Sequence, residues 1–290
     1  MESNVLTAVL MPIALGVIML GLGLSLTLED FKRVVLMPKP VFVGLFCQML
    51  VLPVVCFAIA TGFDLPPALA VGLMLLSASP GGATANLFSH LAKGDVALNV
   101  TLTAVNSVLS LLTLPFIVNY SLVHFMGEGK VLPLQFDKVI QVFAIVLVPV
   151  AIGMFVRSKK PAGAASLEKP VKILSAVFLL LVIAATVAKE RAHVVEYFQQ
   201  VGLAALAFNL VSMAVGYLVP LVVRLPKRQA VAIGMEIGIH NGTLAIAIAS
   251  APTLLNNSAM AVPPAVYSLI MFFTAAAFGY LVNRGTTRAA

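Results

Sequence analysis

The chain has 290 residues, of which 61% are hydrophobic and 10% are charged, and its mean hydropathy is +1.07. Such a chain lacks the polar surface of a soluble globular protein, so its composition indicates an integral membrane protein. The net charge of +7 needs no nucleic-acid partner, because basic residues in cytoplasmic loops serve membrane topology and contact anionic lipid. We expect membrane lipid as a partner, no nucleic acid and no obligatory protein partner.

Apolar runs of about 18 to 25 residues recur along the chain, each long enough to cross a hydrocarbon core about 30 Å thick. The alternation of polar and apolar segments that is typical of an outer-membrane barrel does not occur in the sequence. The pattern predicts an all-α integral membrane protein with about nine transmembrane helices, at residues 5–28, 40–61, 66–91, 96–119, 138–156, 171–188, 200–223, 229–251 and 263–282.

Lysine and arginine are distributed unevenly between the expected loops. If the N-terminus lies outside, the outer loops hold only Lys130, Lys138, Lys189 and Arg191. The other 14 of the 18 basic residues then lie on the inner side, at positions 32, 33, 39, 93, 157, 159, 160, 169, 172, 224, 227, 228, 284 and 288. By the positive-inside rule we expect a multi-pass protein of the cell's inner (cytoplasmic) membrane, with the N-terminus outside and the C-terminus in the cytoplasm.

One acidic residue, Glu236, lies inside an apolar run, in "AVAIGMEIGIHNGTLAIAIAS". An acid near the bilayer centre costs about 3 kcal/mol on insertion scales, so such residues usually face a cavity, a partner or an ion. No lysine or arginine lies within an apolar run to pair with it, and His240, Asn241 and Gly242 also interrupt the span. The alternative is a protonated glutamic acid that makes one helix–helix hydrogen bond.

The third apolar run is interrupted at the corresponding depth, by "SASPGGATAN" at residues 77–86. When the third and eighth runs are aligned, Pro80 and Gly81 fall opposite His240 and Asn241. The two runs have opposite orientations in the membrane, which is the pattern of an inverted repeat. Taken alone, the proline and glycines would be explained equally well by a packing kink.

We predict that both runs unwind, at about residues 79–83 and 237–242, and that the two breaks cross near the middle of the membrane. Pro80 removes an amide donor and clashes with the preceding turn, while Gly81 and Gly82 permit backbone angles and a close approach that a side chain would block. The freed carbonyl groups suit a hard cation such as Na⁺. The free amides that open the second half-helices suit a carboxylate, so the substrate-binding candidates are Gly82, Ala83, Thr84, Asn241, Gly242 and Thr243.

Four segments carry a resemblance to a known family: "GLGLSLTLEDF" at 21–31, "PGGATAN" at 80–86, "AKGDVALNVTLTAVNS" at 92–107 and "EIGIHN" at 236–241. The chain resembles the bile acid:sodium symporter family over nearly its whole length. That family includes bile-acid carriers of animals, plastid carriers of pyruvate and related acids, and many bacterial proteins. This chain lacks the extra leading span of the ten-helix bacterial relatives, so it resembles the nine-span form.

The resemblance implies one transporter unit over residues 1–290, divided into two moving parts. A core domain, at about 40–125 and 200–283, would contain the third and eighth spans as two crossing discontinuous helices. A smaller panel domain would comprise about 1–39 and 138–190. Motion of one part against the other would give alternating access.

The resemblance also implies two coupling Na⁺ ions behind the crossing. Their ligands would be Asn86, Asn99, Thr103 and Glu236 for the first ion, and Gln48, Glu236, His240 and the carbonyls of Ile237 and Ile239 for the second. The chain departs from the family at Ala85 and Asn99, where serine is common, and at His240, where glutamine is common. A neutral imidazole is a poor Na⁺ ligand, so His240 has four possible roles: weak ligand, positioning group for Glu236, proton carrier or core residue without a function.

These expectations describe a sodium-coupled symporter of a small organic anion such as pantoate, a keto acid or pyruvate. A proton-coupled or passive organic-anion facilitator or channel is the alternative. We do not expect an enzyme, because neither a G-x-S-x-G elbow nor an H-E-x-x-H pair occurs in the sequence.

Overall fold

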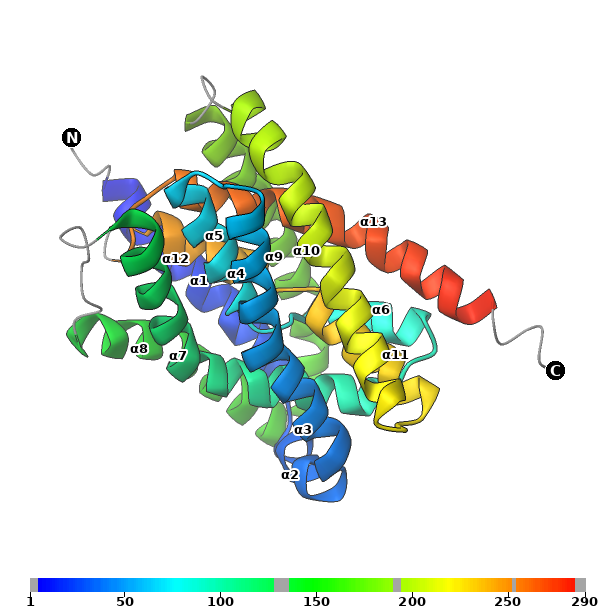
Figure 1. Cartoon of the computed structure of the whole chain (residues 1–290). Helices are drawn as coiled ribbons and strands as arrows, with labels where there is room; N and C mark the ends of the chain where they lie inside the picture. Colours follow the sequence, from blue (N-terminus) through cyan, green and yellow to red (C-terminus); the bar gives the residue numbers. More distant parts are fainter. Residues whose placement is uncertain (1–4, 128–135, 190–193, 252–253, 285–290) are drawn as a thin grey trace.

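The computed structural model describes residues 5–127, 136–189, 194–251 and 254–284, and the helices dominate it (Figure 1). Within these residues the only β-bridge is an isolated one. The helices are α1 (Val5–Ser25), α2 (Leu28–Leu36), α3 (Pro38–Phe46), the π-helix η1 (Cys47–Val51), α4 (Leu52–Gly62), α5 (Pro67–Ser77), α6 (Ala83–Leu91), α7 (Val96–Met126), α8 (Phe136–Lys159), α9 (Pro161–Lys189), α10 (Val194–Val222), α11 (Lys227–Gly238), α12 (Gly242–Ser250), the 3₁₀-helix η2 (Ala259–Ala261) and α13 (Val262–Arg284).

Four stretches of the described chain are long and apolar enough to cross a membrane: Pro38–Gly62, Val96–Met126, Val195–Val222 and Ala259–Arg284. This agrees with an all-α membrane protein, while the count of nine spans stays a prediction. The orientation also stays a prediction. Of the loop residues on which it depends, Lys130, Arg191 and Arg288 lie outside the described residues.

The third and eighth expected spans are each divided into two short helices. Residues 78–82 separate α5 from α6, and residues 239–241 separate α11 from α12. The expected second break was too wide, because Ile237 still belongs to α11 and Gly242 already opens α12. Ala83, which was expected to be unwound, is the first residue of α6.

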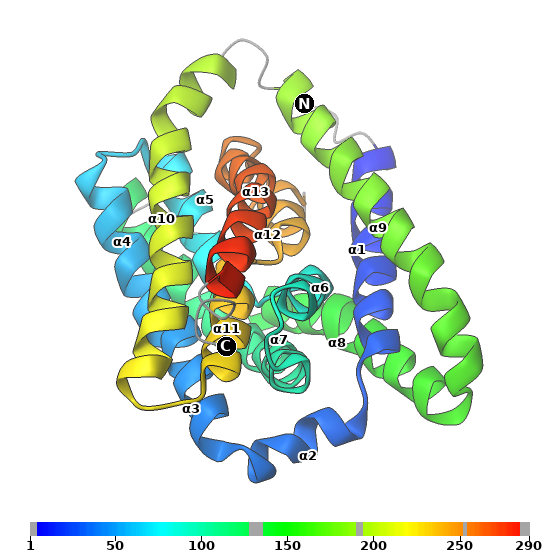
Figure 2. The ribbon, with the colours of Figure 1, turned by 90° about the vertical axis from the view of Figure 1, so that its right-hand side faces the viewer.

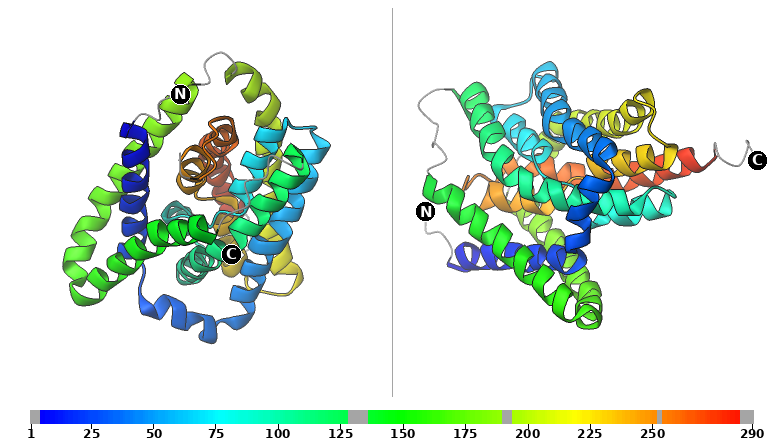
Figure 3. Two further views of the ribbon diagram at one scale, coloured as in Figure 1. Left: turned by 90° about the vertical axis from the view of Figure 1, so that its left-hand side faces the viewer. Right: turned by 90° about the horizontal axis from the view of Figure 1, so that it is seen from below.

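Helices α1, α8 and α9 pack mainly against one another (Figures 2 and 3). The broken helices pack instead among α4, α7, α10 and α13. Helix α2 joins these two groups, running from the end of α1 to α3 at one end of the molecule (Figure 2). The division into a panel domain and a core domain stays a prediction, as does relative motion between them.

Helix α2 begins with a capping box. The Thr27 amide and hydroxyl both donate to Asp30 Oδ2, at 2.7 and 2.8 Å, and Arg33 pairs with the other carboxylate oxygen. Asp30 is buried, whereas the neighbouring Glu29 is exposed and pairs with Lys32. The carboxylate of Asp30 therefore fixes the point at which the chain turns from α1 into α2.

Candidate functional site

The two breaks are in direct contact. Gly81 and His240 form the antiparallel β-bridge, and the Asn241 amide donates to the Pro80 carbonyl at 2.8 Å. In a continuous helix this amide would reach the carbonyl of Ile237, four residues earlier. The expected crossing of two discontinuous helices is therefore confirmed, and main-chain groups hold it together.

Only one of the two glycines at the first break meets a close neighbour, and neither has a positive φ. A Cβ atom added at Gly81 would lie 2.5 Å from Glu236 Cδ, much closer than any real contact. At Gly82 the φ angle is −122°, and the nearest atom to an added Cβ, the amide nitrogen of Thr84, is 4.0 Å away. The expectation that both glycines supply special backbone angles was wrong. Gly81 is required because the Glu236 carboxylate lies against it.

Glu236 lies on α11 and is 1% exposed. The Thr103 hydroxyl donates to its Oε2 at 2.7 Å, while Oε1 is buried and has no hydrogen-bond partner among the described residues. The ion pairs among the described residues are Lys32–Glu29 and Arg33–Asp30, both in α2, so no described basic side chain pairs with the Glu236 carboxylate. The same geometry also fits a protonated acid, whose Oε2–H would donate to the Thr103 hydroxyl oxygen while the Thr103 hydroxyl donates to the main-chain carbonyl of Asn99.

The other ligands expected for the first ion lie on α6 and α7. Asn99 donates through Nδ2 to the carbonyl of Ala232 on α11 at 2.7 Å, and its main-chain carbonyl lies 3.1 Å from the Thr103 hydroxyl, whose one proton also faces Glu236 Oε2. Asn99, Thr103 and Glu236 are thus joined by hydrogen bonds. Asn86 makes no hydrogen bond to them in the described structure. The Oδ1 atoms of Asn86 and Asn99 are both buried without a partner.

Gln48, expected at the second ion, lies in the π-helix η1. Its Nε2 donates to the carbonyls of Ser79 at 3.0 Å and Ser77 at 3.3 Å, and its Oε1 is buried without a partner. Pro53 has no amide to donate to the carbonyl of Met49, which explains why the helix is irregular here. π-helical turns of this kind are frequent at functional sites.

His240 faces the first break from the second. Its Nδ1 lies 3.3 Å from the Ser79 carbonyl and 3.5 Å from Gln48 Nε2, and its ring stacks on Phe208 at a centroid distance of 5.6 Å. The carbonyl contact assigns the proton to Nδ1, which leaves a lone pair on the buried, unpartnered Nε2. The described residues show no hydrogen bond between His240 and Glu236.

Two side chains that sequence reasoning missed hold the end of α11. The Gly238 carbonyl accepts from Asn209 Nδ2 at 3.0 Å and from the Tyr267 hydroxyl at 2.9 Å. Asn209 lies on α10 and Tyr267 on α13, so both neighbouring helices are tied to the second break. Each is a buried polar residue within an expected apolar span, which is the signal that could have indicated them.

The substrate-binding candidates lie at two helix N-termini. Gly82 precedes α6, and Asn241 caps α12 by accepting the Leu244 amide on Oδ1 at 3.0 Å. Thr84, Asn241 and Thr243 are half-buried, in contrast to the fully buried Glu236 side. Only the main chain of Ala83 is described, as the first residue of α6. At Gly242, an added Cβ would collide with Ser268 Oγ, so α12 packs closely on α13.

The residues at the crossing therefore differ in burial. The carboxylate and amide side chains of Glu236, Gln48 and Asn99 are buried, whereas Thr84, Asn241 and Thr243 at the helix N-termini are half-buried. The model of the sodium bile acid symporter family matches residues 12–197. The chain belongs to the sodium bile acid symporter family. This is a family of sodium-dependent membrane transporters.

Relatives in the sodium bile acid symporter family extend the match beyond residue 197. An uncharacterized sodium-dependent transporter of Bacillus subtilis, YocS, is 28% identical over 89% of this chain and 78% of its own length. The probable sodium/metabolite cotransporter BASS1 of Arabidopsis thaliana chloroplasts is 28% identical over 89% of this chain and 62% of its own length. The human ileal sodium/bile acid cotransporter is 24% identical over 95% of this chain and 80% of its own length.

Proposed function

We propose that this chain is a sodium-coupled symporter that carries a small organic anion by alternating access. The observation that carries the proposal is the Glu236 carboxylate, buried without a basic partner and with one oxygen unpaired. A buried charge without compensation is strongly unfavourable, so a cation is the chemically reasonable partner.

The oxygen atoms that we propose as ligands suit a hard cation. Buried acceptors without donors are uncommon in folded proteins, yet Gln48 Oε1, Asn86 Oδ1 and Asn99 Oδ1 are all of this kind. Carboxylate and amide oxygens are ligands that hard cations prefer. We propose a first Na⁺ ion held by the oxygens of Asn86, Asn99, Thr103 and Glu236.

A second Na⁺ ion would share Glu236 and use Gln48 Oε1, His240 and the carbonyls of Ile237 and Ile239. The unpartnered Nε2 lone pair makes His240 a possible but weak ligand. Its imidazole is also the group that would carry a proton if coupling were to protons instead of sodium.

The substrate would lie on the other side of the crossing, with its carboxylate at the N-termini of α6 and α12. Amides at a helix N-terminus favour an anion, and the half-buried hydroxyls of Thr84 and Thr243 offer further donors. Phe88 and Phe272 stack at 6.2 Å nearby on α6 and α13, so this wall is apolar. A small acid such as pantoate, a keto acid or pyruvate suits such a site. Proton-coupled or passive carriage is the alternative.

Transport would require α1, α8 and α9 to move against the crossing. We propose no enzymatic role and no obligatory protein partner. We propose an inner-membrane protein surrounded by lipid, with its N-terminus outside and its C-terminus in the cytoplasm.

Uptake by proteoliposomes tests the function. Labelled pyruvate, pantoate and keto acids are offered with an inward Na⁺ gradient, with no ion gradient, and with an inward proton gradient in Na⁺-free buffer. A sodium symporter accumulates one of these acids above its external concentration only under the Na⁺ gradient. Glu236→Gln should abolish this accumulation, while Glu29→Gln, at an exposed carboxylate, should leave it unchanged.

Other outcomes would contradict the proposal. Accumulation driven by protons without Na⁺ would establish proton coupling, and equilibration without accumulation would establish a facilitator. Sodium binding is measured separately, as a rise in melting temperature when NaCl replaces choline chloride. A ligand at 100 times its Kd stabilises a protein by about 2.7 kcal/mol, and the Glu236→Gln variant should show none of this stabilisation.

A further inference from the structure

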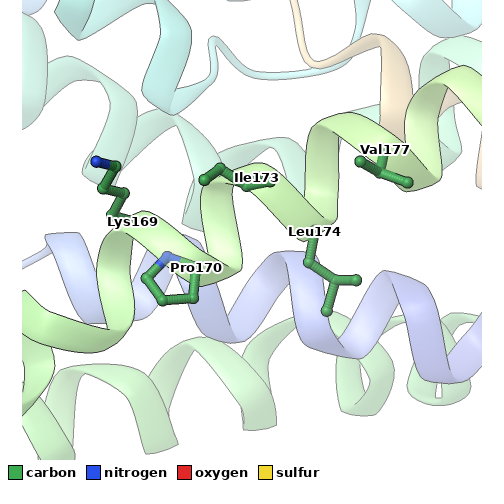
Figure 4. A pocket seen from close by; sticks show the side chains of 5 residues that line it. All are labelled: Lys169, Pro170, Ile173, Leu174 and Val177. Atoms are coloured by element: carbon green, nitrogen blue, oxygen red, sulfur yellow. The ribbon is translucent and has the colours of Figure 1, made fainter.

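Residues of α9 line an apolar hollow (Figure 4). Its volume is about 520 Å³, and it is lined by Lys169, Pro170, Ile173, Leu174 and Val177. These side chains recur every three to four residues, so they share one face of the helix. All five are exposed. The described part of the lining includes no residue of the candidate cation or anion sites.

With the expected span, the hollow lies at the depth of the lipid headgroups and of the adjoining part of the acyl chains. The expected span of α9 begins at residue 171, which places Lys169 at the level of the lipid headgroups. Val177 lies eight residues further along the helix, or about 12 Å deeper at 1.5 Å per residue. The apolar side chains between them therefore face the depth that the upper part of an acyl chain occupies.

The charge of the hollow favours an anionic headgroup. Among the described residues of its lining Lys169 is the one that carries a charge, and the basic residues Arg157, Lys159 and Lys160 lie around the end of α8, before α9. The sequence neighbours Glu168 and Lys172 carry opposite charges, and their side chains lie outside the described residues. Basic residues beside a membrane surface attract anionic lipid.

We propose that this hollow is a binding site for one anionic phospholipid. The headgroup phosphate pairs with the Lys169 amine, and an acyl chain lies along Ile173, Leu174 and Val177. A small organic acid is a poorer occupant, because a small-molecule site usually holds several convergent polar groups and this hollow offers one. The proposal depends on the chain lying in a membrane and does not depend on sodium coupling.

Tryptophan fluorescence tests the site directly. The chain contains no tryptophan, so Val177→Trp introduces a single fluorophore into the hollow. The variant is reconstituted in phosphatidylcholine vesicles that contain brominated phosphatidylglycerol or, at the same mole fraction, brominated phosphatidylcholine. We expect quenching curves that give an affinity about fivefold higher for phosphatidylglycerol, the preference that one lysine near an anionic surface provides.

Two matched variants identify the contribution of Lys169. In the Val177→Trp background, Lys169→Ala should remove the preference for phosphatidylglycerol, and Lys93→Ala, at an exposed lysine in the turn between α6 and α7, should retain it. Equal quenching by both lipids in the parent variant would overturn the proposal. Quenching by neither lipid, or relief of quenching by added pyruvate or pantoate, would also overturn it. If Val177→Trp does not fold, Ile173→Trp offers a second position in the same hollow.

Discussion

Replacing Gly81 by alanine should weaken sodium binding through a displacement that the structure quantifies. The added Cβ would lie 2.5 Å from Glu236 Cδ and closer still to its Oε1, whereas ordinary contacts begin at 3.4 Å, so the carboxylate must move by roughly 1 Å. Such a shift stretches the 2.7 Å bond from Thr103 beyond hydrogen-bonding range. A lost hydrogen bond to a charged group costs about 1.5–3 kcal/mol. This corresponds to a roughly 10- to 150-fold weaker affinity for Na⁺.

The assay is a sodium titration of the purified protein in which the melting temperature is measured at each sodium concentration. Choline replaces sodium so that the ionic strength stays constant. Gly82→Ala is the matched control, because its Cβ meets no atom closer than 4.0 Å, and its half-saturating sodium concentration should equal that of the unmodified chain. If the Gly81→Ala titration superimposes on that of the unmodified chain, the contact between Gly81 and the carboxylate does not position a sodium ligand, and the reasoning fails.

Substitutions at three hydrogen-bonded side chains have further expected outcomes. Thr103→Val should raise the half-saturating sodium concentration about tenfold, because a hydrogen bond to a charged group is lost. Thr101→Val is the control, because the Thr101 hydroxyl bonds only within its own helix, and it should leave the half-saturating concentration unchanged. Equal effects of the two substitutions would contradict the assignment of Thr103. Asn241→Ala removes the cap of α12, so the free energy of unfolding should fall by about 1 kcal/mol and the melting temperature by roughly 2–4 °C, while Asn241→Ser should retain most of the stability. Asp30→Ala should lower the melting temperature by a similar amount through loss of the α2 cap, whereas Glu29→Gln, at a surface ion pair, should have little effect.

The positions of the two breaks could be predicted because several local causes coincide there. Proline alone does not predict a break, since Pro115 and Pro220 lie inside the continuous helices α7 and α10. At Pro80 a proline is followed by two glycines, and a second interruption occurs at the matching depth of another apolar run. The π-helix around Gln48 could not be predicted in the same way, because Pro53 could equally have produced a kink.

The chemistry of the site was predictable only in part. Glu236 could be identified because an acid in an apolar run is expensive and therefore rare. Its contact with Gly81 and the two bonds to the Gly238 carbonyl depend on which faces of distant helices meet. One sequence without tertiary contacts does not contain that information. The likeness to the family supplied Thr103 and Asn99, and the structure joins both residues to α11.

The hydrogen bond between Asn241 and Pro80 joins a main-chain amide to a main-chain carbonyl. Every residue except proline has such an amide, and every residue has such a carbonyl. The attachment of one broken helix to the other therefore does not depend on the side chains beside it. Close packing restricts size at Gly81 and Gly242, while Thr84 and Thr243 lie on the more open side. Substitutions at those two threonines should therefore alter the proposed anion site without disturbing the contact between the two breaks.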